Sequence, residues 1–217
     1  MYIEKVLVIC GGDMPSQELL EAEIISSQYV IAADKGGEVL YKYKRCPDLL
    51  VGDFDSIDNK TIDYFKQRNT PIEKYPMEKD FTDGEMAVEK AIAMNPQEIV
   101  LLGCNGARLD HVFSSIGLLY KVLKSNIRAY IKNDNNTIFL SDRSTCINPK
   151  KEYADRKLSV LPYGAEVTNL TIKGAKYPLN NFQLRIGDML TVSNEFIGCQ
   201  VDITFDSGIL IIFLSKD

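Results

Sequence analysis

The sequence has no basic excess and no long apolar segment. Its 217 residues include 25 lysines and arginines against 30 aspartates and glutamates, for a formal net charge of -5. A chain without surplus positive charge is poorly suited to follow a nucleic-acid backbone, so we expect no nucleic-acid partner. No stretch approaches the roughly 20 continuous apolar residues of a membrane span. We therefore expect no membrane partner, while a small anionic ligand remains compatible with the composition.

Cysteine is scarce and scattered. The five cysteines are Cys10, Cys46, Cys104, Cys146 and Cys199, and no two form a C-x-x-C pair. This spacing argues against a disulfide framework and a zinc ribbon, so we expect free, mostly buried thiols. The opening residues MYIEKVLVIC enter a strand-like run without a basic region. We expect no secretory signal and a cytoplasmic protein.

Two common nucleotide-binding motifs are also absent. No G-x-x-x-x-G-K-[ST] segment occurs, which excludes an ordinary P-loop kinase. No G-x-G-x-x-G follows the first apolar run, so a dinucleotide-binding site has no support.

The first part of the chain alternates apolar runs with amphipathic stretches. The runs at 6–10, 29–34, 48–53, 98–104 and 127–134 predict strands, and the stretches at 16–27, 61–69, 82–94 and 111–125 predict helices. Strands rich in Val, Ile and Leu that alternate with helices are typical of parallel sheets buried on both faces. We predict an α/β domain over residues 1–133, a Rossmann-like parallel sheet with helices on both faces.

The character of the sequence changes near residue 134. Short runs such as 135–142, 157–164, 189–196, 199–206 and 208–215 are separated by turn residues and show no helical period. The DSG at 206–208 is typical of a hairpin turn. We predict an all-β sandwich over residues 134–217.

Polar side chains gather where the predicted strands end. Asp34 ends the second strand, Asp53 and Asp55 the third, and Arg108, Asp110 and His111 follow the fourth. The segment EKDFTDGEMA adds Lys79, Asp80, Thr82 and Asp83 where a helix begins. Ligands bind outside the carboxyl ends of strands in open α/β sheets, so we expect these groups to converge on one edge.

Converging carboxylates repel one another unless a cation lies between them. In an extended D-x-D segment, Asp53 and Asp55 point to the same face while Phe54 points into packing. Carboxylate oxygens and phosphates are ligands that Mg²⁺ prefers. The pattern predicts that Asp53 and Asp55 face Mg²⁺.

Each motif also has a purely structural interpretation. GDFDS alone is equally compatible with a turn, and Asp58 fits a helix N-cap. Thr82 and Glu85 match a capping box, and Arg108 with Asp110 match a surface ion pair. A single histidine such as His111 more often makes a structural hydrogen bond than it catalyses.

The order of these motifs resembles the thiamine pyrophosphokinase family. The segments are AADKGG, PDLLVGDFDSI, KDFTDGEMAVEKA, GARLDH and VSNEF, followed by SGILIIFLS. They cover nearly the whole chain. Two residues depart from the family pattern: Lys35 and Ala107 stand where the family usually has glycine.

This resemblance implies a Mg²⁺-dependent transferase that moves diphosphate from ATP to the hydroxyl of thiamine. It implies a nucleotide- and Mg²⁺-binding catalytic domain, then a thiamine-binding and dimerisation domain, in a homodimer with shared active sites. The implied metal ligands are Asp53, Asp55 and Asp83, and the implied catalytic residues are Asp55, Asp83 and Arg108. The implied nucleotide-binding residues are Asp34, Lys79, Asp80, Thr82, Arg108, Asp110 and His111. Ser193 and Asn194 would contact thiamine from the partner subunit.

Two other functions share the same residues. Another Mg²⁺-dependent nucleotide phosphotransferase or hydrolase would use the carboxylates without binding thiamine. A non-catalytic nucleotide- or thiamine-binding module would bind without turnover. AMP release with and without thiamine separates the three.

Overall fold

The computed structural model describes residues 2–76, 78, 80–148, 153 and 155–216. The chain has a mixed α/β fold and divides into two compact units, Met1–Asp134 and Asn135–Asp217. None of the helices formed by these described residues is long and apolar enough to cross a membrane.

The first unit is built on a parallel sheet. Its strands are β1 (Lys5–Ile9), β2 (Tyr29–Ala33), β3 (Leu49–Gly52), β4 (Ile72–Lys74), β5 (Glu98–Leu102) and β6 (Arg128–Lys132). Their order is β4-β3-β2-β1-β5-β6, and all neighbours pair in parallel. The predicted parallel sheet is therefore confirmed. The chain moves outward from β1 to β4 and then returns to the other side of β1 with β5. This reversal lies between β1 and β5, which is where such sheets bind ligands.

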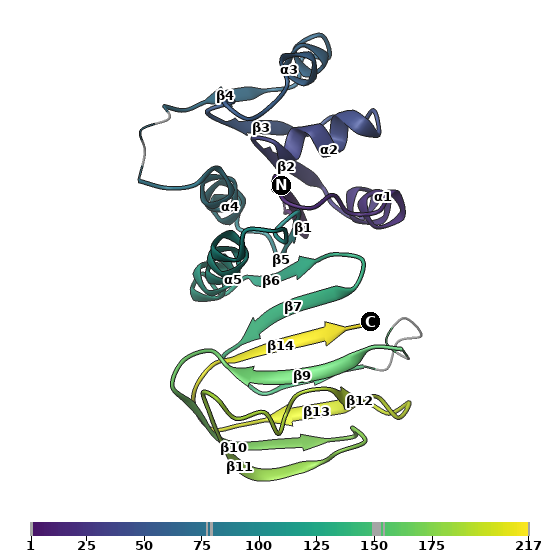
Figure 1. The fold of residues 1–217 in the computed structure, drawn as a ribbon, viewed down its shortest axis with the longest axis vertical. Coiled ribbons are helices and arrows are strands. Elements are labelled where there is room, and N and C mark those ends of the chain that lie inside the picture. Colours follow the sequence, from purple (N-terminus) through teal and green to yellow (C-terminus); the bar gives the residue numbers. More distant parts are fainter. Residues whose placement is uncertain (1, 77, 79, 149–152, 154, 217) are drawn as a thin grey trace. The chain divides into compact units, whose positions relative to one another are not determined.

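Helices cover both faces of this sheet. They are α1 (Gln17–Ile25), α2 (Gly36–Lys42), α3 (Asn59–Lys66), α4 (Asp83–Ala93) and α5 (Leu109–Lys124). Figure 1 shows α4 and α5 on one side and α1 and α2 on the other. Leu7 and Ile9 of β1 share a buried cluster with Leu40 of α2 and Phe65 of α3. Because both faces of each strand meet helices, β1 and β5 read as continuous apolar runs.

Two elements of this unit were not predicted from the sequence. Helix α2 begins with Gly36 and Gly37, a pair that normally disfavours helix. A Cβ at Gly36 would lie only 2.1 Å from the carbonyl oxygen of Ile9, so glycine allows the helix to start against β1. Strand β4 has three residues and too short a pattern to recognise.

The helix starts follow their capping residues. The predicted N-cap at Asp58 is confirmed, because its carboxylate accepts a hydrogen bond of 2.9 Å from the N–H of Lys60. The hydroxyl of Thr82 accepts one of 3.1 Å from the N–H of Glu85, as the capping box predicts. Helix α5 begins at Leu109, two residues before the predicted start at His111.

The second unit contains two antiparallel sheets. One has the order β12-β9-β14-β7, with β7 Asn136–Ser141, β9 Lys157–Pro162, β12 Asn194–Glu195 and β14 Leu210–Ser215. The other has the order β11-β10-β13-β8, with β8 Thr145–Ile147, β10 Glu166–Lys173, β11 Leu179–Arg185 and β13 Val201–Thr204. Leu158 and Ile212 from the first sheet share one apolar core with Leu170 and Ile203 from the second.

Three expectations from the sequence are wrong in detail. The DSG segment does not close a hairpin, because β13 and β14 on either side of it belong to different sheets. The predicted strand at 189–196 is reduced to β12, Asn194–Glu195. The thiols are not mostly buried: all five are free, but Cys46, Cys146 and Cys199 are exposed.

A buried carboxylate joins three elements of the first unit. Glu23 on α1 is only 6% exposed and accepts hydrogen bonds from Lys5 of β1 and, at 2.7 Å, from Lys132 of β6. Burial raises the pKa of Glu23, but the two lysines more than offset this, and the net pKa is lowered. A lowered pKa means that ionised Glu23 stabilises the fold.

We expect Glu23→Gln to lower the free energy of unfolding by about 3 kcal/mol at pH 7, because two lysines lose their buried partner. Glu21→Gln removes a more exposed pair with Arg45 and serves as the control, with an expected change of about 1 kcal/mol or less. Since the folded-state pKa is lowered, the contribution of Glu23 is present above pH ~4.5 and lost as pH falls. Urea unfolding at several pH values measures this, and equal effects of both substitutions would contradict it.

Candidate active site

The loops after β1 and β5 are tied together by backbone hydrogen bonds. The N–H of Gly12 donates to the carbonyl of Gly103 at 2.8 Å, and that of Asp13 to Asn105 at 2.7 Å. A Cβ at Gly12 would lie 2.2 Å from the carbonyl oxygen of Asn105, so this contact requires glycine. The Asn105 amide donates to the Asp13 carboxylate at 3.0 Å. Asp13 was not predicted as a site residue. The one feature of the sequence that could have indicated it is its position directly after Gly11 and Gly12.

Three carboxylates converge beside this junction. Asp34 follows β2, and Asp53 and Asp55 follow the neighbouring strand β3. One ligand oxygen from each lies within 4.8 Å of the others, the one such acidic group among the described residues. The backbone N–H of Asp34 donates to the carbonyl of Val51 at 2.7 Å, which fixes the two strand ends together.

A tight turn brings Asp53 and Asp55 together. Phe54 between them has a φ of 64°, so the predicted extended D-x-D geometry is wrong. The N–H of Asp55 instead donates to the Asp53 carboxylate at 3.1 Å, which closes the turn. The Phe54 ring packs against the buried cluster of the unit, as predicted. Packing of that ring offsets the cost of a left-handed backbone at a bulky residue.

The charge on Asp34 is poorly stabilised by the protein alone. Burial, the largest cause, raises the pKa of Asp34 together with the carboxylates of Asp83, Asp53 and Asp55. The Lys35 backbone N–H lowers it, and the net pKa is about 6. Its Oδ1 atom is buried without a hydrogen-bond partner. An unpartnered carboxylate oxygen facing two more carboxylates fits a hard divalent cation such as Mg²⁺. The sequence predicted that Asp34 converges with Asp53 and Asp55 on one edge, but the family resemblance implied nucleotide binding for Asp34 and not a place among the metal ligands.

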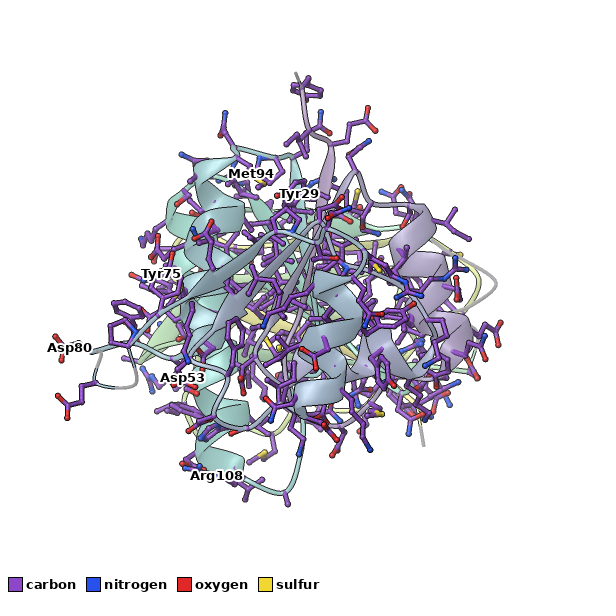
Figure 2. The ribbon with its side chains drawn as sticks, turned by 90° about the horizontal axis from the view of Figure 1, so that it is seen from above. Tyr29, Asp53, Tyr75, Asp80, Met94 and Arg108 are labelled. Atoms are coloured by element: carbon purple, nitrogen blue, oxygen red, sulfur yellow. The ribbon has the colours of Figure 1, made fainter. Side chains whose placement is uncertain are left out.

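The start of α4 lies close to these carboxylates. Thr82 is the N-cap and Asp83 occupies the first turn. The carboxylate of Asp83 raises the pKa of Asp34, yet in the described part of the chain it lies outside the group within 4.8 Å. Figure 2 shows Asp80 on a projecting loop, with its side chain directed away from Asp53. Lys79 lies outside the described residues.

The residues at the start of α5 form an ion pair on the surface of the unit. Arg108 is the residue before the helix, and its guanidinium donates to the Asp110 carboxylate at 2.6 Å. Both side chains are about two-thirds exposed, at 70% and 66%. The neighbouring Asp110 raises the pKa of Arg108, and Arg108 lowers that of Asp110. His111, also exposed, follows in the first turn. In Figure 2, Arg108 and Asp53 lie on the side of the unit opposite to Tyr29 and Met94.

The predicted thiamine-contacting residues lie in the second unit. Ser193 is exposed and has a φ of 60°, and its N–H donates to the Ser159 hydroxyl at 3.0 Å. Asn194 is buried. Its amide oxygen accepts from the N–H groups of Tyr177 and Glu195, and its amide nitrogen donates to the Tyr177 carbonyl at 2.8 Å. The Asn194 side chain therefore holds the backbone of this loop.

The chain matches two family models that together span most of it. Residues 20–131 match thiamin pyrophosphokinase, catalytic domain, and residues 144–210 match thiamin pyrophosphokinase, vitamin B1 binding domain. The thiamine pyrophosphokinase of Bacillus subtilis is 34% identical over 187 residues, which are 86% of this chain and 87% of that protein. The chain belongs to the thiamin pyrophosphokinase family. The resemblance predicted from the sequence motifs is confirmed.

Solved structures of the thiamin pyrophosphokinase family share the fold. The crystal structure of thiamine pyrophosphokinase from Bacillus subtilis has a TM-score of 0.89 at 30% identity and covers 99% of this chain and 100% of that one. Thiamin pyrophosphokinase from Candida albicans has a TM-score of 0.86 at 19% identity, covering 99% and 90%. At that identity the second likeness shows the fold alone.

The two departures from the family pattern are accommodated. Lys35 has a φ of -57° and occupies the N-cap position of α2, so no left-handed conformation is required there. Gly106 has a φ of 158°, whereas the φ of Ala107 beside it is not positive. Alanine at position 107 therefore requires no left-handed backbone.

We expect the Asp34 carboxyl to titrate near a pKa of about 6 in protein free of divalent cations. Because this pKa is raised by folding, its contribution to stability is present below pH ~4 and is lost as pH rises through about 6. Asp53→Asn removes one repelling charge and should lower the pKa of Asp34. Carbon-13 NMR titration measures it, with Asp58→Asn as a control that changes a distant cap. An Asp34 pKa near 4 in the metal-free protein would contradict the expected repulsion.

Proposed function

We propose that this chain transfers a diphosphoryl group from ATP to the hydroxyl of thiamine, giving thiamine diphosphate and AMP. The observation that carries the proposal is the group of Asp34, Asp53 and Asp55 at the strand ends. It lies in a chain that matches both a catalytic and a vitamin B1 binding family model. On this proposal the first unit is a Rossmann-like catalytic domain and the second a sandwich-type thiamine-binding domain, with a boundary near residue 134.

The carboxylates are proposed to hold Mg²⁺ together with the phosphates of ATP. The buried, unpartnered Oδ1 of Asp34 and the crowding around it support this assignment. Asp53 and Asp55 complete the ligand set, and Asp83 would reach it directly or through water. When bound, Mg²⁺ neutralises phosphate charge and orients the phosphates for attack.

The remaining site residues are proposed to position the substrates. Attack of the thiamine hydroxyl on the β-phosphorus breaks its bond to the oxygen bridging the α- and β-phosphates, and AMP leaves. Phosphoryl transfer depends on alignment and charge stabilisation more than on covalent help. Thr82 and the first N–H groups of α4 suit phosphate oxygens. Asp55 or Asp83 would accept the hydroxyl proton.

The cationic side chains would act on the phosphates. Arg108 is exposed, and among the described residues it pairs only with the similarly exposed Asp110. Such a surface pair contributes little energy, and phosphate can replace it. A guanidinium binds phosphate through two parallel hydrogen bonds. We also propose that four further residues bind the nucleotide: Lys79, Asp80, Asp110 and His111.

We further propose a homodimer in which each active site uses both chains. Leu109 and Phe113 on α5 are 77% and 74% exposed, and Ile186, Met189 and Leu190 in the second unit are 76%, 72% and 66% exposed. Apolar side chains this exposed favour a covering partner. Ser193 and the loop held by Asn194 would contact thiamine across that interface. Three exposed free thiols also favour a reducing, cytoplasmic setting.

We expect AMP release from ATP to require both thiamine and Mg²⁺. Asp55→Asn should reduce the rate at least about 100-fold without unfolding the protein, because it removes a charged ligand. Asp58→Asn is the matched control, since asparagine also caps helices, and it should keep nearly full activity. Chromatographic quantification of AMP and thiamine diphosphate provides the measurement.

Each rival function predicts a different outcome of this assay. Release of AMP or phosphate that is independent of thiamine would favour another phosphotransferase or hydrolase. Binding of ATP and thiamine without product would favour a binding module. Full activity of Asp55→Asn at saturating Mg²⁺ would remove Asp55 from the proposed ligand set.

Mixed dimers test the shared site. We expect Asp55→Ala and Ser193→Arg to be inactive alone and to recover about a quarter of wild-type activity after subunit exchange. About half of the dimers are then mixed, and each has one site free of both substitutions. A mixture of Asp53→Ala with Asp55→Ala, which alter the same unit, should stay inactive. If the first mixture also stays inactive after confirmed exchange, each site belongs to one chain.

A further inference from the structure

Asp13 and Asn105 form a polar pair where the strand order reverses. Asp13 follows β1 after Gly11 and Gly12, and Asn105 lies in the loop after β5. The amide nitrogen of Asn105 donates to Oδ2 of Asp13 at 3.0 Å, and the backbone N–H of Asp13 donates to the Asn105 carbonyl oxygen at 2.7 Å. Two bonds in opposite directions therefore fix how Asp13 is presented, at the point where open α/β sheets bind ligands.

The pair has unused hydrogen-bond acceptors. Among the described residues, only Asn105 donates to the Asp13 carboxylate, and it does so to Oδ2, which leaves Oδ1 without a donor. Asp13 is exposed, so a ligand can reach its carboxylate from solvent. Oδ1 of Asn105 is buried and also lacks a donor. A carboxylate has about four acceptor positions, so Asp13 can accept further hydrogen bonds from hydroxyl groups. Its negative charge disfavours a phosphate at the same position.

Glycines leave room beside the Asp13 carboxylate. A Cβ at Gly106 would lie 3.6 Å from Oδ1 of Asp13, so the residue present places no side chain against this oxygen. Toward β2, a Cβ at Gly11 would lie 2.8 Å from Cβ of Lys35, the residue after Asp34. Because two residues of chain span at most about 7 Å, Asp13 lies near the carboxylates of the candidate active site. The glycine pair between them is exposed, which leaves bare backbone along this edge.

We propose that Asp13, oriented by Asn105, binds the ribose hydroxyls of the nucleotide and so makes the site selective for ribonucleotides. The 2′- and 3′-hydroxyls are adjacent, uncharged donors, which suit an exposed carboxylate at a strand end. The phosphates of the same nucleotide would extend over the glycine backbone toward Asp34, Asp53 and Asp55. This inference rests on the proposed function, because it assigns the ribose end of the proposed ATP site.

The exposure of Asp13 sets the size of the expected selectivity. A hydrogen bond to a charged group changes affinity by about tenfold to a hundredfold. The upper end applies when the charged group is left buried and unpaired in the absence of its partner. Water can replace a missing hydroxyl at the exposed Asp13, so we expect a preference near the lower end, about tenfold.

Calorimetric titration of the full chain, with Mg²⁺ and without thiamine, tests the assignment with ATP, 2′-deoxy-ATP and 3′-deoxy-ATP. We expect the wild-type chain to bind ATP about tenfold more tightly than either deoxynucleotide. Asp13→Asn keeps an acceptor for Asn105 but loses the charge. It should weaken ATP binding about tenfold and reduce the preference for ATP to about twofold or less. In turnover assays, the same change should raise KM for ATP and leave kcat nearly unchanged.

Two further variants separate orientation from charge. Asp58→Asn is the matched control, because it alters an exposed carboxylate that caps α3. It should keep the full preference for ATP. Asn105→Ala leaves the Asp13 charge in place but removes the amide that orients it, and it should reduce the preference while the affinity for both deoxynucleotides stays unchanged.

Equal affinity of the wild-type chain for the three nucleotides would overturn the proposal, and this comparison needs no substitution. The proposal is also overturned if Asp13→Asn weakens all three equally, since the pair would then only hold the loops together. Loss of thiamine binding in Asp13→Asn, with ribose selectivity kept, would overturn it in favour of a site for the thiamine cation. Ribose selectivity in a protein without turnover would contradict the proposed reaction and leave this inference standing.

Discussion

Hydrogen bonding between β1 and β5 continues past the ends of the strands, and the arrangement of the site depends on it. Cys10 donates its backbone N–H to Leu102 at the end of β5, and Gly12 and Asp13 donate theirs to the segment that follows β5. These bonds hold two loops together at the point where the strand order reverses. Glycine at position 12 is what allows the backbones to approach so closely. Strands β2 and β3 extend the same edge and bring the acidic residues beside it.

Electrostatic repulsion is concentrated at that edge. Asp34, Asp53 and Asp55 converge, and no cationic side chain in the described part of the chain lowers the pKa of Asp34. Glu23 on α1 has the reverse environment, with Lys5 and Lys132 bound to a buried carboxylate. Lysine side chains neutralise the Glu23 carboxylate, whereas the other three carboxylates face one another, which is the arrangement that the proposed cation would stabilise.

The sequence predicted the elements with strong periodicity and missed those that depend on tertiary contacts. Apolar runs identified the long strands, and Thr82 and Asp58 marked their helices because capping is a local interaction. Helix α2 was hidden by Gly36, whose role is close packing against Ile9. The DSG segment has the composition of a hairpin, but its flanking strands join different sheets.

The site was predicted only in part, because some of its geometry also depends on tertiary contacts. Residues at strand ends were recognised as a group, yet the inclusion of Asp34 beside Asp53 and Asp55 depends on the pairing of β2 with β3. The turn at Phe54 depends on a buried contact that a D-x-D pattern does not encode. Likewise, nothing in VSNEF indicates that the Asn194 amide makes hydrogen bonds with backbone groups of Tyr177 and Glu195.

The position of Phe54 has a thermodynamic consequence. Its partly buried ring packs against the apolar core, and its backbone forms the turn that brings the flanking carboxylates together. Ligand geometry and core packing are therefore linked through a single residue. A cation that binds these carboxylates only in the folded chain shifts the folding equilibrium by mass action, by an amount that grows with the logarithm of its concentration. Loosening the core would in turn weaken cation affinity, even with every carboxylate intact.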